Sequence, residues 1–215
     1  MFFAKRCHKC FGINTDLTGI PTEFHNASID KFNFDIYAKD MTKVKEMIYS
    51  IFNDWDKWKN EGMGIYLYSR TAGSGKTFLA CALARSIMIK YGIQMRFITV
   101  PDYISMIGDS FRRDRGENDY TQIYRTCDLL IFDDVGAQSN ANWYKQEMFK
   151  LINKRMSDGL VTIYTSNIDI NDLNVDDRTK NRIIDTAIPI PMPEESIRMR
   201  NAKSKHEKFL DSVLK

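Results

Sequence analysis

A glycine-rich run at residues 69–77 has the residue types that hold phosphate groups. It reads Ser-Arg-Thr-Ala-Gly-Ser-Gly-Lys-Thr. Its glycines let backbone N–H groups turn toward a phosphate, its lysine can reach the β- and γ-phosphates, and its last threonine offers a hydroxyl to Mg²⁺. A helical pattern follows and adds the positive end of its dipole. We predict a phosphate-binding loop whose contact residues are Ala72, Gly73, Ser74, Gly75, Lys76, Thr77 and Phe78.

One position departs from the usual pattern of such a loop, which has glycine six residues before the lysine. Arg70 stands there. The start of the loop must therefore accommodate a Cβ atom or bend differently. The alternative, an ordinary surface turn, is less favoured because the run lies between an apolar strand pattern and an apolar helix pattern.

Two acidic residues and an amide follow two later apolar segments. Asp133 and Asp134 come directly after 129–132, and Asn167 comes after 161–165. Polar groups at the carboxyl ends of parallel strands lie where ligands bind such sheets. We predict that Asp133 and Thr77 hold Mg²⁺, that Asp134 orients or deprotonates the attacking water, and that Asn167 bonds the γ-phosphate and that water. A helix cap or turn is the alternative for each.

Strand and helix patterns alternate along the chain. Residues 65–68, 94–100, 129–132, 161–165 and 188–192 are predicted strands, and 40–60, 77–91, 101–111, 143–157 and 176–185 are predicted helices. Strands separated by helices of this length indicate a parallel sheet covered on both faces. The predicted fold class is three-layer α/β, and two prolines in 188–192 place that strand at an edge of the sheet.

Composition narrows the class of protein. The 215 residues, 43% hydrophobic and 27% charged, favour one globular domain with an appendage and exclude a disordered chain. Apolar runs such as 129–132 are too short to cross a membrane, so we expect a cytoplasmic protein. The net charge of +3 divides into about −1 for residues 1–195 and +4 for residues 196–215, which excludes a histone-like coat for duplex DNA.

The cysteines are of two kinds. Cys81 and Cys127 lie in apolar stretches and are expected to be buried. Cys7 and Cys10 form a CxxC pair, but no second pair exists to complete a zinc site. A zinc site, a free dithiol and a shortened metal module all stay open.

With these motifs in place, the chain resembles replicative helicase loaders of the DnaC/DnaI family, a branch of the AAA+ ATPases. The likeness also covers the segments 19–21, 26–32, 98–112, 132–138, 177–183 and 196–200. The resemblance implies a P-loop fold with five parallel strands in the order 5-1-4-3-2 and no separate lid domain. It divides the chain into a short N-terminal stub, 1–35, and an AAA+ domain, 36–215.

The resemblance also implies roles for three arginines. Arg182, one helical turn after Arg178, is the expected arginine finger, and Arg178 is the second choice. Arg198 is the expected sensor 2 residue. A guanidinium supplied by a neighbouring copy can offset charge that develops on the γ-phosphate. A surface ion pair with Asp176 or Asp185 is the alternative for the first two.

The resemblance further implies an ATPase with ATP and Mg²⁺ as cofactors, a DnaB-type replicative helicase and single-stranded DNA as partners, and a homo-oligomer in the ATP-bound or helicase-bound state. Residues 111–115, with three arginines beside Phe111, could neutralise DNA phosphates, and Trp143 and Tyr144 could stack on bases. A solvated loop and a core-packing helix start are the alternatives. Two other functions stay open: an IstB-type transposition helper that acts on duplex DNA, and an ATP-gated adaptor that does not hydrolyse ATP.

Overall fold

A five-stranded parallel sheet organises the molecule. The computed structural model describes residues 18–110, 121–136 and 142–214. The strands are β1 (Gly64–Tyr68), β2 (Met95–Thr99), β3 (Leu129–Asp133), β4 (Val161–Ser166) and β5 (Ala187–Pro191). Their order is β2-β3-β4-β1-β5, and every pair is parallel. The predicted fold class and strand order are thus confirmed, with the proline-containing β5 at one edge.

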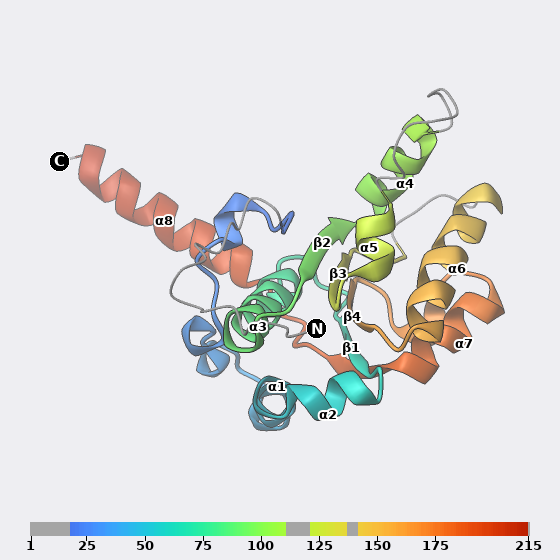
Figure 1. Cartoon of the computed structure of the whole chain (residues 1–215). Helices are drawn as coiled ribbons and strands as arrows, with labels where there is room; N and C mark the ends of the chain where they lie inside the picture. Colours follow the sequence, from blue (N-terminus) through green and yellow to red (C-terminus); the bar gives the residue numbers. More distant parts are fainter. Residues whose placement is uncertain (1–17, 111–120, 137–141, 215) are drawn as a thin grey trace.

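Helices cover both faces of the sheet (Figure 1). They are α1 (Thr42–Asn53), α2 (Trp55–Asn60), α3 (Lys76–Tyr91), α4 (Val100–Ser110), α5 (Gln122–Thr126), α6 (Asn142–Ser157), α7 (Asp177–Thr186) and α8 (Ile197–Val213), with short 3₁₀-helices η2 (Thr22–Phe24), η3 (Ile29–Lys31), η4 (Phe34–Ile36) and η5 (Ile170–Asp172). The helix predicted over 40–60 is interrupted at Asp54, whose φ of −114° and ψ of 37° are not helical. The interruption turns Trp55 into the core, where it is 1% exposed.

Two apolar layers pack against the two faces of the sheet. On one face, α3 and α1 lie over β1, β3 and β4, and the predicted buried residue Cys81 belongs to this layer. On the other face, α4, α6 and α7 enclose a second layer that contains Cys127. This arrangement leaves the carboxyl ends of the strands as the edge where loops and ligands can meet.

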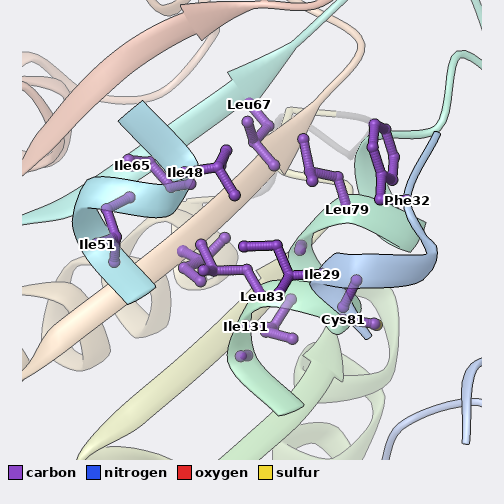
Figure 2. Packing of buried hydrophobic residues seen from close by; sticks show 14 of the residues in the cluster. Ile29, Phe32, Ile48, Ile51, Ile65, Leu67, Leu79, Cys81, Leu83 and Ile131 are labelled. Atoms are coloured by element: carbon purple, nitrogen blue, oxygen red, sulfur yellow. The ribbon is translucent and has the colours of Figure 1, made fainter. Parts of the chain in front are cut away.

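Residues 18–41 pack on α3 as part of the first layer. Ile29 is 1% exposed, and its N–H donates to Ser86 Oγ at 3.1 Å. Figure 2 shows Ile29 and Phe32 beside Leu79, from α3. Residues that precede position 36 therefore contribute to the core of the sheet domain, while the division of the chain at 35/36 stays a prediction. Cys7 and Cys10 lie outside the described residues.

Helix α8 was not predicted from the sequence. None of its residues is buried, so its sequence carries no packing pattern of a core-facing helix. The side chain of Ser196 caps its first turn by accepting a hydrogen bond from Met199 N at 3.3 Å. In Figure 1, α8 extends away from the sheet. Among the described residues, no helix combines the length and apolar character needed to cross a membrane.

Candidate functional site

The glycine-rich loop connects β1 to α3, as predicted, and its two central glycines have left-handed backbones. Gly73 has φ of +75° and Gly75 has φ of +94°. A Cβ atom on Gly75 would lie 2.5 Å from Tyr37 Oη, and one on Gly73 would lie 2.7 Å from Arg198 Cβ. Both positions therefore require glycine for conformation and for space.

Lys76 is held by the loop itself. Its Nζ atom donates to Ser69 O, Thr71 O and Ser74 Oγ, each at 3.1 Å. Burial lowers the pKa of Lys76, and the nearby carboxylates of Glu194 and Asp133 oppose that shift. Phosphate oxygens are acceptors of the same kind as these three oxygens, so a bound phosphate could replace them without leaving the ammonium unpaired.

Asp133 stands at the end of β3 and joins two strand ends to the loop. Its Oδ1 atom accepts from Thr77 Oγ1 at 2.8 Å and from Thr165 Oγ1 at 2.6 Å. Burial raises the pKa of Asp133, and the two hydroxyl hydrogen bonds work against that rise. A buried carboxylate beside a threonine hydroxyl is a donor set that suits Mg²⁺ together with phosphate oxygens and water. The described residues contain no group of three or more His, Cys, Asp or Glu placed to hold a metal ion by themselves.

Asp134 and Asn167 also meet, as expected from their places after neighbouring strands. Asn167 Nδ2 donates to Asp134 Oδ1 at 3.1 Å, and Asp134 N donates to Thr165 Oγ1 at 3.0 Å. Asp134 has a φ of +62°. Among the described residues, it is the only non-glycine residue with a positive φ. This left-handed conformation, which aspartate tolerates better than most residues, turns the chain directly after the strand.

These groups line one cavity of about 650 Å³. All seven predicted loop residues line it, together with Asp133, Asp134, Asn167 and Arg198. Arg198 is further tied to the loop because its N–H donates to Gly73 O at 3.1 Å. The structure thus brings together every predicted site residue except Arg182.

The other wall of the cavity was not predicted. It is formed by residues that precede α1, namely Glu23, Phe24, Lys31, Phe32, Asn33, Ile36 and Tyr37. The Phe32 ring stacks on Phe78 at 5.7 Å between centroids and on Tyr37 at 6.2 Å. Aromatic side chains are of a type that can pack against a flat base. The concentration of aromatic residues in 24–37 was the signal available in the sequence.

Arg182 and Arg178 gather elsewhere, on the face formed by α6 and α7. The Arg182 guanidinium lies 5.1 Å from the centre of the Phe149 ring, and that of Arg178 lies 4.9 Å from it. Arg182 Nε also donates to Asn153 Oδ1 at 2.5 Å. Arg178 Nε lies 3.6 Å from Asp176 Oδ1, so the surface ion pair considered as its alternative is present.

The candidate DNA contacts divide in two. Residues 111–115 lie outside the described residues. Tyr144 is 3% exposed and packs in the core, whereas Trp143 is 45% exposed. Of this aromatic pair, Trp143 alone is available to stack on a base.

Comparisons with known proteins agree with this geometry. Over 114 residues, 53% of the chain, it is 31% identical to the replicative helicase loader DnaI of Bacillus subtilis (strain 168), and this match covers 36% of that protein. Over 93 residues, 43% of the chain, it is 28% identical to the replicative helicase loader DnaC of Escherichia coli (strain K12), of which 38% is covered. The chain thus spans a little over one third of these two relatives.

Solved structures share the fold. A crystal structure of DnaI matches with a TM-score of 0.69 and 23% identity over 82% of this chain and 96% of that one. A crystal structure of the DnaC helicase loader matches with a TM-score of 0.69 and 19% identity over 80% of this chain and 100% of that one.

A family model extends the likeness across most of the sequence. The model described as IstB-like ATP binding protein matches residues 23–205, a span that includes the loop, both strand-end acids, the aromatic wall from Glu23 onward and Arg198. With this match and the cavity geometry together, the chain belongs to the family of IstB-like ATP-binding proteins.

Proposed function

We propose that the chain is an ATP-dependent helicase loader that binds ATP with Mg²⁺, binds single-stranded DNA and helps to place a DnaB-type replicative helicase on DNA. The names of its relatives, replicative helicase loaders DnaI and DnaC, support this choice. The observation that carries the ATPase part is the connected network of Thr77, Asp133, Asp134 and Asn167 at the carboxyl edge of the sheet.

Each group of the cavity has a task in this proposal. Backbone N–H groups of the loop and Lys76 bind the β- and γ-phosphates, while the rings of Phe32 and Phe78 hold the base. Thr77 and Asp133 would hold Mg²⁺, which when bound neutralises charge on the phosphate oxygens. Asp134, fixed by Asn167, accepts a proton from the attacking water or orients it.

Hydrolysis in this proposal needs a second copy. The cavity is lined by Arg198 but not by Arg182, which lies on the α6–α7 face with Asn153 and Phe149. An arginine presented at an outer face can enter the site of a neighbouring copy and stabilise charge on the γ-phosphate. ATP binding then depends on one chain, and turnover depends on assembly.

A mixing experiment tests the arrangement in trans. Arg182→Ala and Asp134→Asn are each expected to lose ATPase activity when assayed alone. In a mixture, the Arg182→Ala copy keeps an intact Asp134, and its Asp134→Asn neighbour supplies an intact Arg182, so activity should return. The control is a mixture of Asp134→Asn with Lys76→Ala, in which both copies keep Arg182. In this mixture no copy has both Lys76 and Asp134 in its own site, so no site is complete and the mixture should stay inactive. Failure of the first mixture to recover activity, at concentrations where the wild-type chain hydrolyses ATP, would exclude the finger in trans.

A capture experiment tests the partner. With ATP, the chain should retain a DnaB-type helicase, and single-stranded DNA should alter its ATPase rate; the Lys76→Ala variant should do neither. The family match also keeps a transposition helper as a second candidate. Stimulation by duplex DNA and capture of a transposase in place of the helicase would favour that function. Nucleotide affinity without turnover under all these conditions would favour the non-hydrolysing adaptor.

A further inference from the structure

The start of the glycine-rich loop is bound by a carboxylate from a distant part of the chain. Glu194 lies between β5 and α8, and its two oxygens accept four hydrogen bonds from three consecutive loop residues. Glu194 Oε1 accepts from Arg70 N at 2.9 Å. Glu194 Oε2 accepts from Thr71 N and Thr71 Oγ1, both at 2.7 Å, and from Ser69 Oγ at 3.1 Å.

This is the part of the loop where the sequence departs from the usual pattern. The Arg70 side chain turns outward, 78% exposed, and pairs with Asp172 at 3.3 Å, so it does not enter the loop. Its backbone N–H is one of the groups that Glu194 holds. A position that usually relies on glycine is here fixed by an external acceptor.

Glu194 and Lys76 both bond to Thr71, but through different groups of that residue. Thr71 gives its N–H and its hydroxyl to Glu194, while its carbonyl accepts from Lys76 Nζ. Ser69 likewise gives its hydroxyl to Glu194 and its carbonyl to Lys76. Moving Glu194 would therefore move the carbonyls that orient the lysine.

The chemistry of the contact requires an ionised acid. Each oxygen accepts from a backbone N–H, which can only donate: that of Arg70 at Oε1 and that of Thr71 at Oε2. A carboxylate is an acceptor at both oxygens, whereas a glutamine would direct its own N–H₂ group at one of these two N–H groups. Although burial opposes ionisation, the hydrogen bonds from Thr71 and Arg70 lower the pKa of Glu194.

We propose that Glu194 is a positioning residue for nucleotide binding: it fixes residues 69–71 so that Lys76 and the loop N–H groups face the phosphates. The inference rests on the proposed function, since it assumes that the loop binds a nucleotide. It assigns a role in phosphate binding to the segment between β5 and α8, in addition to the role expected of Arg198 in the first turn of α8.

The test compares Glu194→Gln and Glu194→Ala with Glu207→Gln, which removes an equal charge from an exposed position on α8. Loss of charge-assisted hydrogen bonds should weaken ATP and ADP affinity about 10–100-fold in the Glu194 variants, with kcat at saturating ATP changed much less. Hydrogen exchange of the nucleotide-free protein should show faster exchange at the N–H groups of Arg70 and Thr71. Glu207→Gln should match the wild type in both measurements.

The outcomes separate this inference from the proposed function. Wild-type affinity in both Glu194 variants overturns the inference while ATP binding stands. A wild-type chain that binds no nucleotide overturns the proposed function, and unchanged exchange at Arg70 and Thr71 then overturns the loop-fixing role as well. Unfolding of both variants would mean that Glu194 supports the whole fold and would also overturn a specific positioning role.

Discussion

The carboxyl edge of the sheet and the α6–α7 face differ in how complete they are. At the sheet edge, polar groups from β3, β4 and α3 already contact one another around one cavity. On the α6–α7 face, Arg178 and Arg182 share the Phe149 ring, and neither lines the cavity of their own chain. The first region brings its polar groups together at a cavity, whereas in the second Arg178 is exposed beside Asp176 and Arg182 is half-buried beside Asn153, away from that cavity.

The difference follows from what each region must do in the proposed function. Binding needs groups that are positioned before the ligand arrives, which a strand edge provides because neighbouring strands fix the register of their ends. A side chain that enters the site of a neighbouring copy only on assembly has to lie at an outer face of its own chain. Its conformation has to be fixed there before assembly. Phe149 and Asn153 provide that support for Arg182.

The largest expected effect comes from removing the guanidinium of Arg182. Arg182→Ala should lower kcat by about 10³-fold or more, because the charge on the γ-phosphate loses its guanidinium partner, while ATP affinity stays near that of the wild type. ATPase rates over a range of protein concentrations measure this. Arg178→Ala is the matched variant and should cost far less; a reversal of the two effects would move the finger to Arg178 and keep the comparison between the regions.

The next effect lies within the sheet edge. Asp134→Asn should lower kcat about 10²–10⁴-fold, because the amide cannot take a proton from water, and it should leave Asp133, Thr77 and nucleotide affinity in place. Single-turnover rates and equilibrium titration with ATP separate the two quantities. A variant that loses affinity as much as turnover would show that Asp134 belongs to binding and not to chemistry.

The parts of the site predictable from sequence are those carried by short segments. The loop at 69–77 and the acids after 129–132 each lie within a few residues of the strand that positions them, so local pattern and the parallel-sheet rule place them correctly. The sheet order came from family resemblance and is confirmed. The roles of these residues in catalysis stay predictions.

The rest depended on contacts between distant segments. The aromatic wall at 24–37 reaches the loop because short 3₁₀ turns pack on α3, an arrangement that no periodic pattern announces. Glu194 meets residues 69–71 across more than 120 positions of sequence. Helix α8 has no buried residue, so hydrophobic spacing could not reveal how it would lie.

A third prediction tests whether the N-terminal wall is part of the same folded unit as the sheet edge. Ile29→Ala removes a fully packed side chain from the layer over α3 and should lower the free energy of unfolding by about 2–5 kcal/mol. Urea denaturation measures the loss. Ile89→Ala on α3, where the side chain is 39% exposed, is the control and should change stability by about 0.5 kcal/mol or less. Equal losses of stability in the two variants would show that residues 18–41 do not belong to the core of the folded unit.

The smallest expected effect concerns Asp133 in the nucleotide-free protein. Burial raises the pKa of its carboxyl above the ordinary 3.8, so the folded chain takes up a proton more readily than the unfolded chain. The contribution of Asp133 to stability should therefore fall as pH rises from about 3.8 through the raised pKa, and this loss should persist in full at neutral pH. Asp133→Asn has no such charge and should be the more stable protein at pH 7, with a melting temperature about 2 °C higher.

That advantage should shrink as the pH is lowered through the pKa of Asp133, because the wild-type carboxyl then becomes neutral as well. Urea denaturation of both proteins at several pH values gives the difference directly, and Asp211→Asn, an exposed position on α8, controls for loss of one negative charge. Mg²⁺ with ATP should reverse the order, since the wild type alone offers the carboxylate to the metal. If Asp133→Asn is no more stable than the wild type at pH 7, the hydroxyls of Thr77 and Thr165 already compensate the buried charge in the absence of a ligand.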